Sequence, residues 1–311
     1  MNAVLVDAVK KFAADRVDTA TGPLITSGFS RVMLDETGID YLSKPRICEI
    51  KKSPRHYDWR YNKGNEPDDT PAKKYGRLVD WAILAPQEFL RRYVIAKTFK
   101  GKGAKKAKAE WLKSVAKDAI ILTETDAQDI SNQIDALYSH ERAAKLLSNG
   151  TPQVHTYYHD HEFQVATLHP DGSQSLEPAF WYGVMDFYRS GNFIIDVKTT
   201  ACAEWWNFNR DCYKFNYHIQ MYLYRRWVQG ITGSKPDMAI IALEKGGPYN
   251  VEIFEIPERW MEHANYEVTL AIQSYNECKS TGQWHGYSKV PIRLPFPNYT
   301  KSRFDDEEGD Q

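Results

Sequence analysis

The chain lacks any long apolar run. It has 311 residues, and no stretch approaches the roughly eighteen consecutive apolar residues that a membrane-spanning helix needs. The first residues, MNAVLVDAVKKFAADRVD, carry charges on both sides of a short apolar patch, without the apolar region and cleavage site of a secretion signal. These absences argue against a membrane protein or a secreted one, and they predict a cytoplasmic location.

Cysteine is also scarce. The four cysteines are far apart in the sequence and form no CxxC pair. This spacing argues against zinc held by cysteines, against a disulfide framework and against an iron–sulfur cluster. We expect free thiols in a reducing compartment.

Several common catalytic patterns are missing. The segment GKGAKK lacks the spacing of a phosphate-binding GxxxxGK(S/T) loop and follows no predicted strand, so nothing suggests a requirement for ATP. No Ser/His/Asp or Cys/His pattern emerges. Four histidines gather in the predicted strand region, but their spacing does not make a metal site; they are His155, His159, His161 and His169.

Charge is nearly balanced overall but unevenly distributed. The net charge is −1, and removing the five acidic residues of the tail DDEEGDQ changes it to +4. Residues 97–108 hold six lysines in twelve positions. This run is either a solvated loop or a patch that contacts phosphates, with Lys102, Lys105 and Lys106 as the candidate DNA-binding residues.

The hydrophobic pattern predicts helices, then strands, then an alternation of both. Three units are expected: an N-terminal extension (1–45), one domain (46–300) and a disordered acidic tail (301–311). The fold class is α/β, with a mixed central sheet flanked by helices. Helices are expected from 53, over 75–94 with a break at Pro86, and over 109–117, 123–149, 213–229 and 258–282; strands are expected at 153–160, 162–170, 180–189, 192–200, 237–245 and 249–257.

Three charged residues mark two neighbouring strands. In IIDVKTT, Asp196 and Lys198 are two positions apart on a strand, so they point to the same side. Asp186 lies on the preceding strand of a predicted hairpin and should come beside Asp196. Two carboxylates that repel each other suit a hard cation such as Mg²⁺ or Mn²⁺, while the alternative is a hairpin that merely carries surface charges near its turn.

The following helix adds an amide and a phenol. Gln220 and Tyr224 are four residues apart and share one helix face, from which they could hold a phosphate or the lysine. Aromatic residues in such a helix are otherwise typical of a core.

Six segments, in order, make the chain similar to a known family. They are SPRHYDWRY, YGRLVDWAILAPQEF, GVMDFY, IIDVKTT, HIQMYLYRRW and QWHGYS followed by IRLPFP, and together they span roughly residues 51–297. In this order they resemble the PD-(D/E)xK nuclease superfamily, and within it the RecE-type exonucleases of phages and prophages (exodeoxyribonuclease VIII-like domain). No single segment is specific, but the series is.

The resemblance implies a restriction-endonuclease-like core and an Mg²⁺-dependent exonuclease that digests linear duplex DNA from 5′ to 3′. It implies that Asp186 and Asp196 are metal ligands, that the Val197 carbonyl completes the coordination and that Lys198 is the catalytic lysine. Gln220 and Tyr224 would be the supporting pair. It also implies a ring-like homo-oligomer, duplex DNA ends and a single-strand annealing recombinase as partners, and a bacterial host cytoplasm.

Two positions depart from the family pattern. Asp80 stands where relatives usually carry a metal-binding histidine; we expect it to serve as a third carboxylate ligand, although a lost ligand and a weakened enzyme is the alternative. Gln153 stands near a position where relatives often carry glutamate, and no role is assigned to it. The rival hypotheses are an endonuclease of the same superfamily and an inactive DNA-binding protein on a nuclease fold.

Overall fold

The computed structural model describes residues 40–65, 67–68, 70–116, 119–189 and 191–294. Most of the expected N-terminal extension and the whole acidic tail therefore lie outside the described residues. Near residue 40, Leu42 is buried; its backbone donates a hydrogen bond to Phe180 O and accepts one from Tyr182 N. No helix among the described residues is long and apolar enough to cross a membrane.

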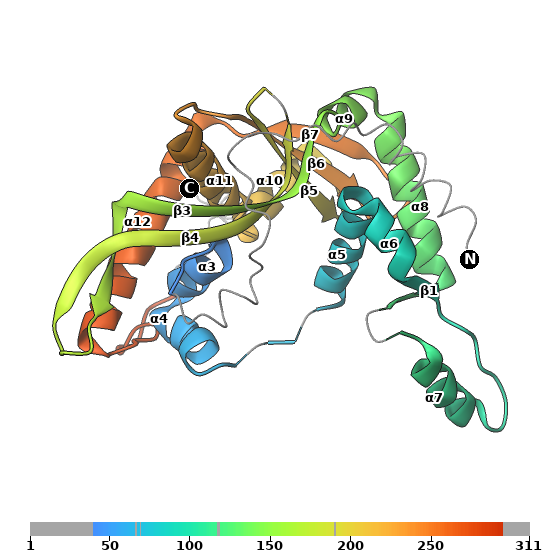
Figure 1. Ribbon diagram of the computed structural model, residues 1–311, viewed down its shortest axis with the longest axis horizontal. Helices are drawn as coiled ribbons and strands as arrows, with labels where there is room; N and C mark the ends of the chain where they lie inside the picture. The colour runs from blue at the N-terminus through green and yellow to red at the C-terminus, as the bar shows by residue number, and fades with distance from the viewer. Residues whose placement is uncertain (1–39, 66, 69, 117–118, 190, 295–311) are drawn as a thin grey trace, which may run out of the picture.

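A five-stranded mixed sheet forms the centre of the molecule (Figure 1). The strand order is β3-β4-β5-β6-β7; β5 and β6 run parallel and the other neighbours run antiparallel. This architecture confirms the predicted α/β class. The strands are β3 (Gly150–Leu168), β4 (Gln174–Arg189), β5 (Phe193–Thr200), β6 (Asp237–Glu244) and β7 (Val251–Glu255).

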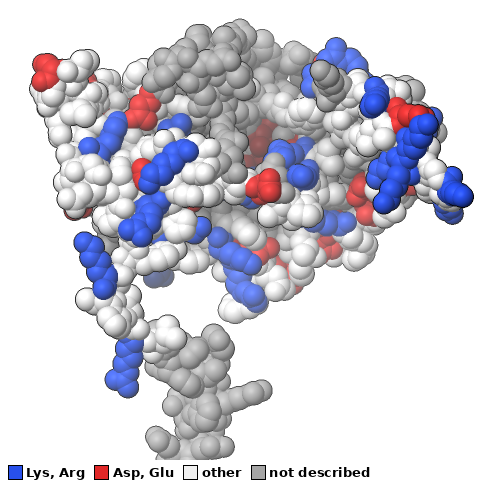
Figure 2. Space-filling model, turned by 90° about the horizontal axis from the view of Figure 1, so that it is seen from below, with Lys and Arg blue, Asp and Glu red and all other residues white. Residues whose placement is uncertain are grey.

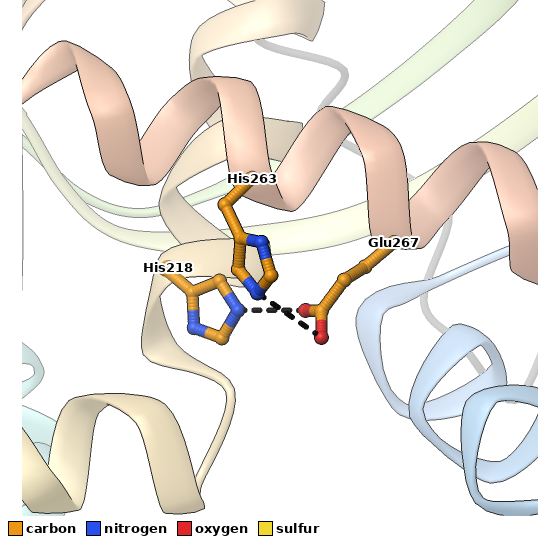
Figure 3. A group of neighbouring side chains, drawn as sticks. All are labelled: His218, His263 and Glu267. Atoms are coloured by element: carbon orange, nitrogen blue, oxygen red, sulfur yellow. Dashed lines mark hydrogen bonds and ion pairs between the residues drawn. The ribbon is translucent and has the colours of Figure 1, made fainter.

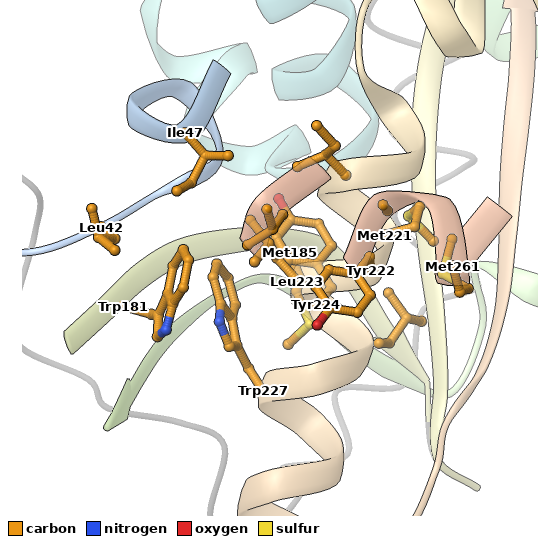
Figure 4. Packing of buried hydrophobic residues seen from close by; sticks show 14 of the residues in the cluster. Leu42, Ile47, Trp181, Met185, Met221, Tyr222, Leu223, Tyr224, Trp227 and Met261 are labelled. Atoms are coloured by element: carbon orange, nitrogen blue, oxygen red, sulfur yellow. The ribbon is translucent and has the colours of Figure 1, made fainter. Parts of the chain in front are cut away.

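Helices cover both faces of the sheet. Adjacent residues of β5 contribute to different cores, because Ile194 belongs to one buried cluster and Ile195 to the other. The first cluster, centred on Trp181 and Trp227, joins the sheet to α3, α11 and α12 (Figure 4). The second joins it to α5, α6 and α8. The helices are α3 (Lys44–Lys52), α4 (Pro54–Tyr57), the π-helix η1 (Asp58–Asn62), α5 (Pro71–Leu84), α6 (Pro86–Arg92), α8 (Glu124–Ser139), α9 (Glu141–Leu146), α10 (Trp205–Lys214), α11 (Tyr217–Thr232) and α12 (Glu258–Thr281).

Several predicted boundaries are confirmed. Pro54 begins a helix after Ser53, and the helix over 75–94 does break at Pro86, although its first part begins earlier, at Pro71. Thr123 caps α8 with a reciprocal capping box, in which the Thr123 hydroxyl accepts from Asp126 N and the Asp126 carboxylate accepts from Thr123 N.

The structure differs from the sequence prediction in three places. The single helix over 123–149 is two helices, because the His140 side chain accepts a hydrogen bond from Ala143 N and starts α9. The helix expected from 213 begins at Tyr217, because Asn216 adopts a left-handed conformation at its N-cap and separates it from α10. The two strands expected at 153–160 and 162–170 are one strand with a bulge, at which Asp160 accepts hydrogen bonds from Glu162 N and Phe163 N.

A basic arm projects from the helical end of the molecule (Figure 1). It leaves the body after β1 (Tyr93–Ile95) and returns at β2 (Ile120–Leu122), which pair in parallel. The lysine run, expected as a loop over 97–108, is half helical, because α7 (Ala104–Ser114) begins inside it. Alanine and lysine are strong helix formers, and they outweigh the repulsion between lysines here. We call residues 96–116 the lysine arm.

Candidate active site

The end of β5 brings one lysine and two carboxylates together. Asp186 on β4 faces Asp196 across the hairpin, because the ladder pairs Phe187 with Ile195. The Lys198 ammonium contacts Asp196 Oδ2 directly and lies 3.7 Å from Asp186 Oδ2. Asp186 also accepts a hydrogen bond of 2.9 Å from the Val197 backbone N–H. The predicted juxtaposition of these three side chains is therefore present.

The electrostatics of the cluster reflect burial and charge repulsion. Burial, reinforced by the charge of Asp196, raises the pKa of Asp186 well above its ordinary value. Burial lowers the pKa of Lys198, but Asp196, Asp186 and Asp80 outweigh burial and raise it well above its usual range. Lys198 is therefore a charged ammonium at neutral pH.

Gln220 fixes Asp196 from behind. Its side-chain amide donates 2.9 Å hydrogen bonds to Asp196 Oδ1 and to the Tyr224 hydroxyl. The Tyr224 hydroxyl in turn donates to the Val184 carbonyl at 2.5 Å. This chain of contacts ties the fully buried Asp196 to the backbone of β4 through α11. The shared face of Gln220 and Tyr224 is as predicted, but the amide holds the aspartate and has no described contact with the lysine.

Asp80 reaches the same site from α5. It lines a cleft of about 530 Å³ together with Asp186, Arg77 and Lys74. Burial raises the pKa of Asp80 to about 7, with the charge of Asp196 adding to the shift and Lys198 opposing it. Three carboxylates thus converge on one lysine.

The donor set fits a hard divalent cation. Asp80, Asp186 and Asp196 supply only oxygen atoms, the ligands that a hard cation prefers, and burial raises the pKa of Asp80 and of Asp186, so a bound cation would favour their ionised forms. In the structure Lys198 lies between Asp186 and Asp196. A metal ion held by these oxygens therefore requires the ammonium to draw back.

The backbone of Val197 faces the site on both sides. Its N–H donates to Asp186, and its carbonyl oxygen lies 3.4 Å from Lys198 Nζ, on the side where a ligand to the metal was predicted. Its side chain is buried in the core. The strand is therefore anchored at the position between the two charged residues.

The three candidate DNA-binding lysines lie in the arm, away from the carboxylates. Lys102, Lys105 and Lys106 are all exposed. The arm ends at β2, whose Ile120 and Ile121 line the same cleft as Asp80 and Asp186. Lysine and arginine side chains are spread over the face seen in Figure 2. The structure thus connects the base of the lysine arm to the cleft.

Two further features had no role assigned to them from the sequence. Gln153 also lines the cleft and stands opposite Asp186, because the ladder pairs Pro152 with Phe187 and Val154 with Met185. Gln153 has a positive φ of 48°, a local distortion of β3 that the sequence pattern does not predict. The second feature is a group formed by His218, His263 and Glu267, whose members are too far apart in the sequence to form a motif. The four histidines of the strand region form no such group in the described part of the chain.

Comparison with known proteins places the chain in a family. A family model described as "PDDEXK-like domain of unknown function (DUF3799)" matches residues 43–290. Superfamily members of this kind are nucleases that depend on a divalent metal ion. A search of curated proteins found no match.

Solved structures support the fold. The chain is similar to a putative exonuclease from Eubacterium rectale, with a TM-score of 0.55 and 14% identity over 89% of this chain and 98% of that one. A second similarity, to the protein SSO0001, has a TM-score of 0.27 and 11% identity over 90% of this chain and 92% of that one, which is too distant to carry an argument. The matched residues include every member of the carboxylate–lysine cluster, and the chain belongs to the PDDEXK-like domain family DUF3799 of the PD-(D/E)xK nuclease superfamily.

Proposed function

We propose that this nuclease is an Mg²⁺-dependent exodeoxyribonuclease that degrades linear duplex DNA from 5′ to 3′ and leaves 3′ single strands. The observation that carries the proposal is the contact of Lys198 with both Asp186 and Asp196 beside an open cleft. Apart from Asp80, the residue types and their order along the chain resemble those of RecE-type exonucleases.

The roles of the residues follow from their surroundings. Asp80, Asp186 and Asp196 would hold the metal ion, which when bound polarises the phosphate and activates a water molecule. Gln220 keeps Asp196 in one orientation by its hydrogen bond to Oδ1. Lys198 carries a proton on Nζ, so it stabilises the negative charge that develops on the phosphate during attack.

The lysine arm would grip the duplex outside the cleft. Its lysines are exposed and therefore free to contact phosphates without reorganising the core. Each phosphate contact of this kind makes binding weaker as salt concentration rises. The arm thus supplies affinity, and the cleft supplies chemistry.

The proposed biological setting follows the same resemblance. We infer a role in phage-type recombination in the bacterial cytoplasm, where the 3′ single strand would pass to a single-strand annealing recombinase. A homo-oligomeric ring that encloses the DNA would keep the enzyme on its substrate between cleavage steps.

End-labelled substrates test this proposal. Linear duplexes labelled at the 5′ or the 3′ end, and a closed circular duplex as control, would be incubated with the purified protein in Mg²⁺ or in EDTA. We expect early release of the 5′ label, later release of the 3′ label and an intact circle. Cleavage of the closed circle would identify an endonuclease, and no cleavage of any substrate by folded protein would identify a DNA-binding protein.

A further inference from the structure

Two histidines and one glutamate converge between α11 and α12 (Figure 3). None of them belongs to the carboxylate–lysine cluster. His263 and Glu267 lie four residues apart on one face of α12, and His218 reaches them from α11. His218 Nε2 is 2.8 Å from Glu267 Oε2, and His263 Nε2 is 3.4 Å from Glu267 Oε1. One ligand atom from each residue lies within 4.8 Å of the other two.

The hydrogen bonding of His218 is incomplete for a neutral imidazole. Its two ring nitrogens face the Cys212 carbonyl oxygen, at 3.4 Å, and the Glu267 carboxylate, and both of these groups are acceptors. A neutral ring carries one N–H and can satisfy only one of them. A second proton would satisfy both, but His218 is 1% exposed, and burial disfavours the charged ring. A cation between Nε2 and the carboxylate removes the conflict.

The second contact of His218 is the one expected of a metal ligand. Histidines that bind a metal through one nitrogen usually donate the other N–H to a backbone carbonyl or a carboxylate, which fixes the ring. Here Nδ1 faces the Cys212 carbonyl and leaves Nε2 directed at Glu267. The Tyr213 ring stacks on both imidazoles, with its centroid 5.6 Å from that of His218 and 6.0 Å from that of His263, which holds the two imidazoles nearly parallel.

Lys51 occupies part of this position. Its ammonium is 2.6 Å from Glu267 Oε1, and it also donates to Asn216 Oδ1 at 2.8 Å. Because Lys51 has this second acceptor and its side chain is 28% exposed, it can release the glutamate and keep Asn216. Lys51 therefore competes with a metal ion for Glu267 without closing the site.

We propose that His218, His263 and Glu267 form a zinc site that fastens α11 to α12. Two imidazoles and one carboxylate are a known three-ligand set for Zn²⁺, with a fourth position left for water. Ligand atoms around tetrahedral zinc are about 3.4 Å apart. The two histidine–glutamate distances, 2.8 and 3.4 Å, lie near this value, and the side chains adjust to bring all three ligand atoms, now within 4.8 Å of one another, around one ion. His263 is half exposed and gives the ion a path from solvent. The nitrogen ligands distinguish this site from the all-oxygen cluster proposed for Mg²⁺.

Binding of Co²⁺, a coloured substitute for Zn²⁺, tests the proposal. The full chain would carry Asp196→Asn, so that the carboxylate cluster contributes little to binding. We expect one Co²⁺ per chain with visible absorption bands of tetrahedral type, displaced by Zn²⁺ and not by Mg²⁺. Adding His263→Ala should lower the affinity by at least about tenfold, and adding Lys51→Met should raise it, because the competing ammonium is gone.

Two results would overturn the proposal: absence of the tetrahedral Co²⁺ bands, or Co²⁺ bands that persist unchanged after His263→Ala. His263 is on the surface, so its substitution should leave the fold intact, and circular dichroism checks this. Gln283 is an exposed polar residue just after α12, so Gln283→Ala serves as the control and should leave Co²⁺ binding unchanged.

Discussion

Replacing Asp80 with asparagine should make the metal-free protein more stable at alkaline pH while it weakens the nuclease. Burial raises the pKa of Asp80 to about 7 from an ordinary value of 3.8. A carboxyl group whose pKa is higher in the folded state contributes its full stability only at a pH below its unfolded-state pKa. This contribution is lost as the pH rises from the unfolded-state pKa through the folded-state pKa.

The pKa values give the size of the effect. A shift of about three pKa units corresponds to at most about 4 kcal/mol, and the partial exposure of the cleft reduces this. Without metal, ionised Asp80 therefore destabilises the parent above pH 7, mainly through desolvation and through repulsion from Asp196. D80N removes this charge, so it should gain about 1–4 kcal/mol at pH 8.5 and only about a quarter of that at pH 4.5, which lies little above the ordinary pKa of 3.8.

Urea denaturation in EDTA at the two pH values measures this difference, with the parent and D80N side by side. Adding Mg²⁺ at pH 8.5 should then stabilise the parent more than D80N, because only the parent keeps three carboxylates. Lower stability of D80N than of the parent at pH 8.5 would refute the account of Asp80 as an unbalanced buried charge.

Three further predictions concern the support of the site. Tyr224→Phe removes the hydrogen bond to the Val184 carbonyl and one partner of Gln220, so thermal unfolding should show a loss of about 1–2 kcal/mol, together with reduced kcat. Gly183→Ala should cost about 1–3 kcal/mol in urea denaturation, because a Cβ would lie 2.5 Å from the buried Trp227 ring; Gly246→Ala, with open space around it, should cost almost nothing. The combined substitution of Lys102, Lys105 and Lys106 by alanine should weaken DNA binding and leave kcat at saturating DNA unchanged. The slope of log binding constant against log salt concentration should become less steep by about 0.9 for each phosphate contact that is lost.

The central part of the fold could be predicted from the sequence because its signals are local. The apolar run of IIDVKTT requires a buried strand, and the short turn after Arg189 requires a hairpin, which together bring Asp186 and Asp196 face to face. The helix pattern likewise placed Gln220 and Tyr224 on one face. These residues are close because of backbone periodicity alone.

The parts that could not be predicted depend on tertiary contacts. No pattern indicates that Gln220 contacts Asp196 in preference to Lys198, because that choice depends on how α11 packs behind β5. The meeting of His218 with Glu267, 49 residues apart, depends on the packing of α11 against α12. The division of the helix expected over 123–149 depends on one histidine side chain that caps the next helix, a role usually taken by other residue types.

The most direct test of the active site is the rate of nucleotide release from linear duplex DNA by the parent and by Asp196→Asn in saturating Mg²⁺. Asparagine has nearly the same shape and can still meet Gln220, so circular dichroism should show an intact fold. We expect the parent to release nucleotides and the variant to be slower by at least about a thousandfold, because a charged ligand of the metal is lost. Equal rates for the two proteins would contradict the assignment of Asp186, Asp196 and Lys198 as the catalytic cluster.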